Sequence, residues 1–274
     1  DTSIIESKEI LNNFIIPSFK NSIKYDRYAG YFSSSALEAY WEGLSSFIHR
    51  GGEIRLACSH HLLKSDIDSL SNSIDPLYQE KLLIEDFQSF AEKPENVTSS
   101  EILASLIKFK KIKIRIVISK DEKGFPLMNS LFHPKRGFFL DHEKNTVAFF
   151  GSANESKSSL YGSTWDEVEY QTSWNNADDV SIKHKRFEKI WNGNHPQLIS
   201  YKLTDQTIGI LTKNAVETED QLIQKIKNIE KEIEKKKIIS EEQSSKNEVK
   251  ERNKLYDHQS DVLDDWEKNQ RNGI

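Results

Sequence analysis

The chain has 274 residues, with 38 Lys and Arg against 43 Asp and Glu, which gives a formal net charge of −5. A chain of this length can bury a sizeable core in one or two domains. The negative charge argues against a globally basic nucleic-acid binder, so any contact with nucleic acid must come from a local patch. The one cysteine, Cys58, excludes an internal disulfide and a cysteine-based metal site.

Targeting signals give a further set of expectations. No stretch approaches twenty consecutive apolar residues, so a spanning helix is not expected. The N-terminus has no basic region followed by an apolar run, which is the pattern of a secretory signal. The sequence therefore predicts a cytoplasmic protein with no membrane partner.

Strand and helix patterns alternate from residue 1 to about 205. The aromatic run at 27–32 predicts a strand, and the serines after it can cap a helix over 36–49. The glycine pair at 51–52 ends that helix and leads into a strand over 53–58.

The second half of this region continues the alternation. Isoleucines at every second position predict a strand over 112–118. Helices are expected over 64–92, 99–110 and 182–191, and further strands over 133–141, 146–151 and 166–173. Such strand–helix–strand units predict an α/β sandwich with a central mixed β-sheet flanked by helices.

The composition changes after this region, and residues 206–254 are expected to form a charged helical linker or coiled coil. Leu222, Ile226, Ile229 and Ile233 are spaced 4, 3 and 4 residues apart among Lys and Glu. This spacing is typical of a heptad seam. It fits a helix that docks on its own domain equally well, so both interpretations stay open.

The residues that can carry chemistry lie between 132 and 170. His133 and Lys135 are two apart, and on a strand such residues project from the same face. Gly151 stands at the end of an apolar strand, where it allows close backbone approach to a ligand. Ser152 and Asn154 follow it and add neutral hydrogen-bonding groups beside a helical turn that can receive an anion.

Two carboxylates, Glu167 and Glu169, share one face of the next expected strand. A neutral imidazole can attack phosphorus, while a carboxylate on its other nitrogen fixes the tautomer. Lysine and asparagine can meet the charge that develops on the phosphoryl oxygens. The set suits a phosphodiesterase that needs no divalent ion. Taken singly, the same residues also fit a surface His–Lys pair, a capping turn and a solvated strand face.

The order His133-x-Lys135, Gly151-Ser152-x-Asn154 and a glutamate-bearing strand resembles the phospholipase D-like (HKD) superfamily. The similarity covers about residues 20–195 and is strongest to single-motif nucleases, such as those fused to superfamily-2 helicases in restriction and phage-defence enzymes. It implies a phospholipase D-like sandwich and a metal-independent DNA endonuclease that forms a covalent phosphohistidine.

The resemblance also implies roles for individual residues. His133 would be the nucleophile, Lys135 and Asn154 would bind the phosphate with help from Ser152 and Gly151, and Glu167 would orient the histidine. Two features depart from the family pattern. Its aspartate would fall at Leu140, one residue before Asp141, and the register of the acidic strand leaves Glu169 as an alternative to Glu167.

A nuclease also needs contacts with its substrate and partners. Lys111, Lys113 and Arg115 are candidate DNA contacts, although a charged helix end and strand start would explain them as well. Because the chain has only one copy of the family motif, the resemblance implies a homodimer whose active site unites both copies. The second His133 would then serve as general acid.

The last segment, 255–274, contains Tyr256-Asp257-His258-Gln259 and resembles the start of a superfamily-2 helicase ATPase. We therefore expect a nuclease domain over 1–205, a linker over 206–254 and a truncated helicase domain after it. ATP and Mg are expected only for the missing helicase part, and no cofactor for the nuclease. The expected partners are DNA, the helicase domain in cis and further defence-system subunits. The alternatives are a non-cleaving DNA-binding module and, less favoured, a lipid phosphodiesterase.

Overall fold

The computed structural model describes residues 3–6, 9–29, 36, 41–59, 75–127, 132–152, 167–232 and 234–235. The chain divides into two compact units, Asp1–Asn228 and Ile229–Ile274. The segment 255–274, which resembles a helicase start, lies outside the described residues. No helix in the described part of the chain combines the length and apolar character needed to cross a membrane.

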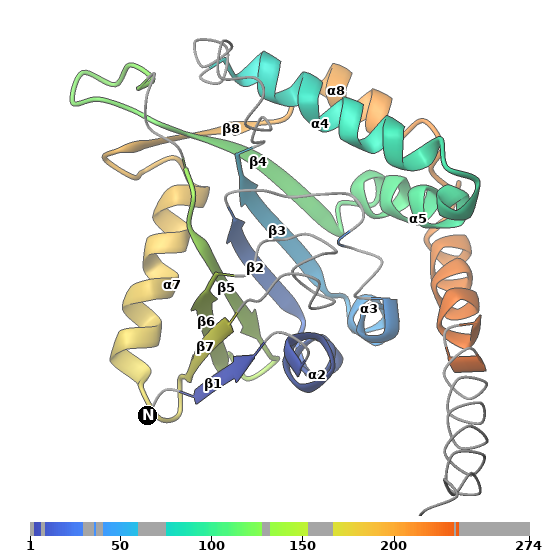
Figure 1. The fold of residues 1–274 in the computed structure, drawn as a ribbon, viewed down its shortest axis with the longest axis horizontal. Coiled ribbons are helices and arrows are strands. Elements are labelled where there is room, and N and C mark those ends of the chain that lie inside the picture. Colours follow the sequence, from blue (N-terminus) through green and yellow to red (C-terminus); the bar gives the residue numbers. More distant parts are fainter. Residues whose placement is uncertain are drawn as a thin grey trace, which may run out of the picture. The chain divides into compact units, whose positions relative to one another are not determined.

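An eight-stranded sheet in the order β1-β7-β6-β5-β2-β3-β4-β8 forms the centre of this unit (Figure 1). The three strands β2, β3 and β4 are parallel neighbours, and every other pair in the sheet is antiparallel. The strands are β1 (Ser3–Glu6), β2 (Lys24–Ala29), β3 (Glu53–Cys58), β4 (Ile112–Ser119), β5 (Lys135–Leu140), β6 (Thr146–Gly151), β7 (Glu167–Thr172) and β8 (Leu198–Lys202).

Helices cover both faces of this sheet, with α7 on one face and α2, α3 and α5 on the other (Figure 1). The helices are η1 (Ile10–Ile15), α2 (Ile16–Asn21), α3 (Trp41–His49), α4 (Pro76–Ala91), η4 (Pro94–Asn96), α5 (Val97–Lys108), α7 (Ala177–Trp191) and α8 (Asp205–Leu211). The expected α/β class, a central mixed sheet flanked by helices, is confirmed.

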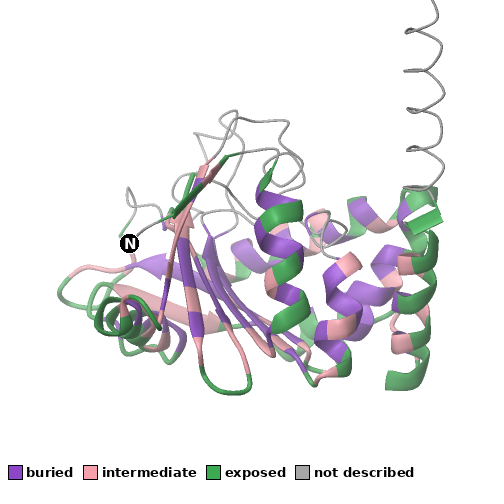
Figure 2. Cartoon of the chain, turned by 90° about the horizontal axis from the view of Figure 1, so that it is seen from below, coloured by how far each residue is buried: buried purple, intermediate pink, exposed green. Residues whose placement is uncertain are grey.

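Each face of the sheet has its own core, because successive strand side chains point to opposite faces. On the α7 face, Phe138 and Tyr28 pack against Phe187 of the helix. On the opposite face, Tyr25 and Phe139 stack with ring centroids 4.5 Å apart, and further aromatic rings pack around them. The inner strands are accordingly buried, while the helices expose their outer sides (Figure 2).

Most of the expected elements are present, with shifted ends. The strands at 53–58 and 146–151 lie where the sequence places them. The aromatic strand begins earlier than expected, at Lys24, and residues 30–32 of the expected strand lie outside the described residues. The helix expected from 64 begins at Pro76, where the Asp75 carboxylate accepts the backbone N–H of Leu77 as an N-cap. The edge strands β1 and β8 were not predicted.

The chain beyond residue 205 continues to pack on the sheet domain. Residues 219–228 are helical, and the seam residues Leu222 and Ile226 are buried. An ion pair of 2.6 Å joins Lys225 to Glu101 of α5, and the backbone N–H of Val216 donates to the Ser105 hydroxyl. The first compact unit therefore extends to Asn228.

Candidate active site at one edge of the sheet

The segments that carry the His-x-Lys, Gly-Ser and glutamate motifs all lie along one edge of the sheet, the edge formed by the carboxyl ends of the parallel strands β2, β3 and β4. At this edge β2 ends at Ala29, which pairs with Lys135 at the start of β5. The end of β6 at Gly151 pairs with Val168 of β7 at the same edge, where β3 and β4 also end. The carboxyl ends of parallel strands are a common place for ligand sites in α/β proteins. The topology therefore gathers the sequence motifs at the edge where a site is expected.

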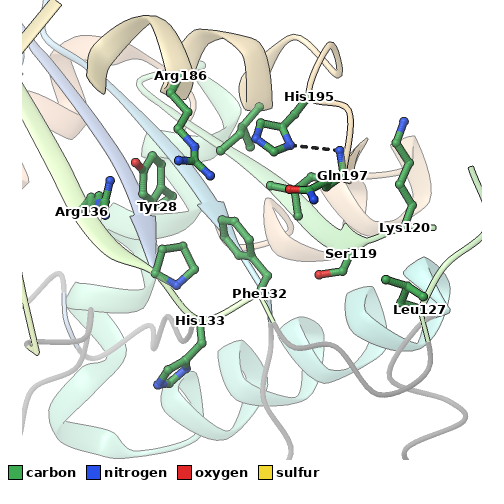
Figure 3. Close-up of a pocket in the computed structure, with 13 residues that line it drawn as sticks. Tyr28, Ser119, Lys120, Leu127, Phe132, His133, Arg136, Arg186, His195 and Gln197 are labelled. Atoms are coloured by element: carbon green, nitrogen blue, oxygen red, sulfur yellow. Dashed lines mark hydrogen bonds between the residues drawn. The ribbon is translucent and has the colours of Figure 1, made fainter. Parts of the chain in front are cut away.

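His133 and Lys135 lie next to each other at this edge. Their side-chain nitrogens, Nε2 and Nζ, are 2.6 Å apart. The strand expected over 133–141 begins only at Lys135, so His133 precedes β5 and is exposed. Figure 3 shows its ring pointing away from Phe132. The pair still forms, because a two-residue separation along extended backbone keeps both side chains on one side.

The environment of His133 favours its neutral form. Partial burial lowers the pKa of this imidazole below its ordinary value of 6.5, and the charge of Lys135 lowers it further. Both effects oppose protonation. A neutral imidazole keeps a lone pair on one ring nitrogen, which is the form that a nucleophile requires.

At Gly151 and Ser152 the end of β6 pairs with the start of β7. The Ser152 backbone N–H donates to the Glu167 carbonyl at 3.2 Å, and the Glu167 N–H donates to the Ser152 hydroxyl at 3.2 Å. A Cβ on Gly151 would lie 2.0 Å from the Glu167 carbonyl oxygen. The glycine is therefore required by the close approach of the neighbouring strand, whereas the sequence suggested the approach of a ligand.

Replacement of Gly151 by alanine is expected to destabilise the domain by about 1–3 kcal/mol, because the new methyl group must displace the β7 backbone. Gly209 in α8 is the matched control, since a Cβ there meets no atom within 4 Å. Alanine at that helical position should be neutral or stabilising by up to about 1 kcal/mol. Urea unfolding of both variants measures the difference. Equal stability of the two variants would contradict the close approach.

The two glutamates project from the opposite face to Lys135. Glu169 pairs with Phe150, which pairs with Arg136, so Glu167 and Glu169 share the α7 face of the sheet with Arg136. Lys135 leaves β5 on the other face. Among the described residues, neither glutamate contacts His133. Their roles in orienting the histidine remain predictions, and Asn154 lies outside the described residues.

The three candidate DNA contacts have partners inside the molecule. Lys111 forms an ion pair of 3.2 Å with Glu219, and Lys113 forms one with Glu53. The Arg115 guanidinium lies 4.8 Å from the ring centroid of Trp191. Whether these residues also contact DNA stays a prediction.

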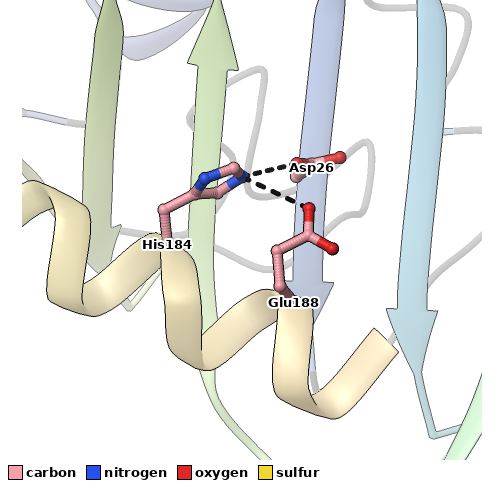
Figure 4. Close-up of side chains that lie close together, drawn as sticks. All are labelled: Asp26, His184 and Glu188. Carbon is pink, nitrogen blue, oxygen red and sulfur yellow. Dashed lines mark hydrogen bonds and ion pairs between the residues drawn. The ribbon is translucent and has the colours of Figure 1, made fainter. Parts of the chain in front are cut away.

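A buried ionic cluster beneath α7 was not predicted from the sequence (Figure 4). Arg55 of β3 donates from Nε and Nη2 to the two Asp26 carboxylate oxygens, both at 2.6 Å, and Asp26 is fully buried. Nη2 also contacts Glu188 of α7 at 2.5 Å, and the His184 ring nitrogen Nε2 is 2.8 Å from Asp26. Asp26 and Arg55 both lie at inward positions of buried strands, β2 and β3.

This cluster holds α7 on the sheet through ion pairs and hydrogen bonds, and its role is structural. Asp26, His184 and Glu188 offer ligand atoms within 4.8 Å of one another, a spacing that a metal ion could use. However, Arg55 already occupies the space between the two carboxylates and neutralises them. Burial opposes ionisation of Asp26, but hydrogen bonds from Arg55 and His184 lower its pKa overall. The cluster therefore has its cation already.

No family model matches the sequence, and no curated protein matches it. Solved structures that match the chain include NucT from Helicobacter pylori, at 12% identity and a TM-score of 0.41, with 74% of this chain and 99% of that chain covered. Nuc from Salmonella typhimurium, described as a phospholipase D family member, has 11% identity and a TM-score of 0.39, with the same coverage. The phosphatidylserine synthase of Haemophilus influenzae has 12% identity and a TM-score of 0.44 over 89% of this chain and 47% of that chain. All three TM-scores are below 0.5, so the case for a function rests on the residues of this chain.

Proposed function

We propose that this chain is a phosphodiesterase that cuts DNA as an endonuclease, with His133 as the nucleophile and no metal in the reaction. The observation that carries the proposal is the 2.6 Å separation between His133 Nε2 and Lys135 Nζ at the carboxyl edge of the parallel strands. A phosphate bound beside this pair would accept the ammonium hydrogen bond in place of Nε2, and the freed imidazole lone pair would then face phosphorus from the same side.

The reaction has two steps. In the first, Nε2 attacks phosphorus, the N–P bond forms and the bond to the leaving oxygen breaks, while a general acid gives that oxygen a proton. In the second, the group that gave up its proton accepts one from water as the water oxygen attacks phosphorus, the N–P bond breaks and Nε2 regains its lone pair. The set of His133-x-Lys135 with Gly151-Ser152-x-Asn154 occurs once in the sequence, so we assign the general acid to His133 of a second copy in a homodimer.

The other motif residues assist this centre. Lys135 and Asn154 would stabilise the charge on the phosphoryl oxygens, with Ser152 and Gly151 beside them. Glu167 would hold the protonated ring nitrogen, with Glu169 as the alternative. These assignments rest on the order of the motifs and on the arrival of β5, β6 and β7 at one edge of the sheet.

The proposed setting is a cytoplasmic helicase–nuclease for restriction or phage defence. It rests on the similarity of the segment around Gln259 to the start of a helicase ATPase. In such a protein, ATP and Mg would serve the helicase in cis, and further defence subunits would join the complex. The nuclease itself would need neither.

Cleavage of a supercoiled plasmid in excess EDTA tests the proposal. We expect nicked and linear products to form at the same rate with and without the chelator, because the nucleophile is a side chain and not a metal-bound water. Loss of cleavage in EDTA that Mg²⁺ restores would contradict the proposed mechanism. Retention of the plasmid in a gel shift without any cleavage would favour the alternative of a DNA-binding module.

A further inference from the structure

A cavity of about 370 Å³ opens between α7, the end of β4 and the start of β5 (Figure 3). Three cations from different elements line it: Lys120 follows β4, Arg136 belongs to β5 and Arg186 projects from α7. Tyr28 and Gln197 add neutral polar groups. No carboxylate is among the described residues that line the cavity.

These three cations differ from several other basic side chains of the domain. Within the described part of the chain, none of Lys120, Arg136 and Arg186 forms an ion pair. Other cations of the domain do have carboxylate partners, as in the pairs Arg55–Asp26, Lys111–Glu219 and Lys183–Asp179. Like charges around one cavity repel one another, and an anion that enters the cavity removes this repulsion.

The titratable neighbours of the cavity respond to this positive charge. Burial lowers the pKa of His195, and Arg186, Lys120 and Lys189 lower it further. Burial raises the pKa of Tyr28, although Arg136, which hydrogen-bonds to its hydroxyl, and Arg186 act in the opposite direction. Both groups are therefore neutral near pH 7, and both keep a proton to donate.

The proton of His195 can be assigned to one nitrogen. The backbone N–H of Gln197 donates to His195 Nδ1 at 3.2 Å, so Nδ1 is the acceptor (Figure 3). In the neutral ring the proton must then lie on Nε2, which is a donor. Guanidinium, ammonium, phenol and imidazole N–H groups together suit a ligand made only of acceptors, and a phosphate group is such a ligand.

We propose that this cavity binds a phosphate group of the nucleic-acid strand on which His133 acts. The inference rests on the proposed function for the identity of the strand. His133 and Pro134 also border the cavity, whereas the His133 ring turns to the other side of β5. The short segment 132–134 thus separates the two places, and a strand that crosses it puts one phosphate at His133 and another in the cavity.

The substitution Arg186→Gln tests the cavity, because this side chain is exposed and its loss should not disturb folding. Lys185→Gln is the matched control: it removes the same charge from the neighbouring exposed position of α7, and Lys185 does not line the cavity. The measurement is the affinity for a short single-stranded oligonucleotide across a range of KCl concentrations. We expect the slope of log K against log [salt] to fall by about 0.7 for the lost phosphate contact in Arg186→Gln. Lys185→Gln should keep the wild-type slope, and equal slopes for the two variants would overturn the proposal.

A second arm identifies the source of the phosphate. Inorganic phosphate or a nucleoside monophosphate is added to the wild type, and NMR of the His195 ring measures binding and the pKa of the imidazole. We expect the oligonucleotide to displace both small ligands, and each ligand to raise the pKa of His195 by adding negative charge. Small ligands that bind while the oligonucleotide fails to displace them would overturn the strand as the source.

The outcome for this cavity can be separated from that for the catalytic proposal. The binding measurements need no cleavage, and they can be repeated in His133→Ala. If Arg186→Gln lowers the salt slope as expected but the wild type does not cut DNA, the nuclease is refuted and the cavity remains a phosphate site. Cleavage that depends on His133, together with an unaltered slope in Arg186→Gln, would refute only the cavity.

Discussion

His133→Ala is expected to reduce DNA cleavage in EDTA by at least about 10³-fold, since the variant has lost the atom that forms the covalent intermediate. Oligonucleotide binding should remain, because Lys135 and the cations of the cavity are unchanged. Single-turnover cleavage of a labelled oligonucleotide measures the rate. Quenching of the wild-type reaction with alkaline detergent, in which the acid-labile N–P bond survives, would yield labelled protein if the phosphohistidine accumulates, and the variant should yield none.

His142→Ala is the matched control for this experiment. His142 is an exposed histidine in the turn between β5 and β6, at the opposite edge of the sheet from His133. The adjacent Asp141 carboxylate accepts the backbone N–H groups of Glu143 and Asn145 and holds that turn. His142→Ala should cleave at the wild-type rate. Cleavage by His133→Ala at a similar rate would refute the histidine nucleophile.

The same experiment has a pH dependence with a defined sign. Burial and the Lys135 charge lower the pKa of His133 below 6.5. The reactive neutral form therefore persists to a lower pH than for an ordinary histidine, and it is lost as the pH falls through the lowered value. We expect the acid limb of the cleavage profile to lie below pH 6.5. Lys135→Met should move the pKa of His133 upward, which NMR of the imidazole can follow even if Lys135→Met does not cleave.

Local pattern was enough to predict the inner strands of the fold. Alternating isoleucines predicted β4, and apolar runs ended by polar turns predicted β3 and β6 close to their observed bounds. The edge strands gave no such signal. In β1 only four residues pair with one neighbour, and Ile4 is exposed, so burial imposes little pattern on the sequence.

The candidate site was predictable where it depends on local spacing and unpredictable where it depends on strand pairing. The two-residue spacing of His133 and Lys135 places both side chains together whether or not the strand includes His133. The face of a glutamate, in contrast, depends on strand register, and a shift of one residue moves it to the other side of the sheet. The pairing of β6 with β7 fixed that register, and it puts Glu167 and Glu169 on the face opposite Lys135. Contacts between distant segments, such as Asp26 with Arg55, have no local pattern at all.

The ionic cluster beneath α7 leads to the largest expected effect on stability. Arg55→Met should reduce the free energy of unfolding by about 3–5 kcal/mol, because it leaves the fully buried Asp26 carboxylate without its bidentate partner. Lys113→Met on the adjacent strand is the control. Its ion pair with Glu53 is partly exposed, so its loss should cost no more than about 1 kcal/mol. Urea unfolding at neutral pH measures both values.

The pH dependence of this loss identifies its cause. In the wild type the pKa of Asp26 is below its ordinary value of 3.8, so the cluster stabilises the fold above that pH and loses this contribution on acidification. In Arg55→Met the burial of Asp26 is no longer offset, and its pKa in the folded state should rise. The penalty is then greatest at pH 7, where the unfolded carboxylate is ionised, and it shrinks as the pH falls towards 3.8. A stability difference that stays constant between pH 7 and pH 4 would assign the loss to the packing of Arg55 on Phe187 and Trp191 instead of to the buried charge.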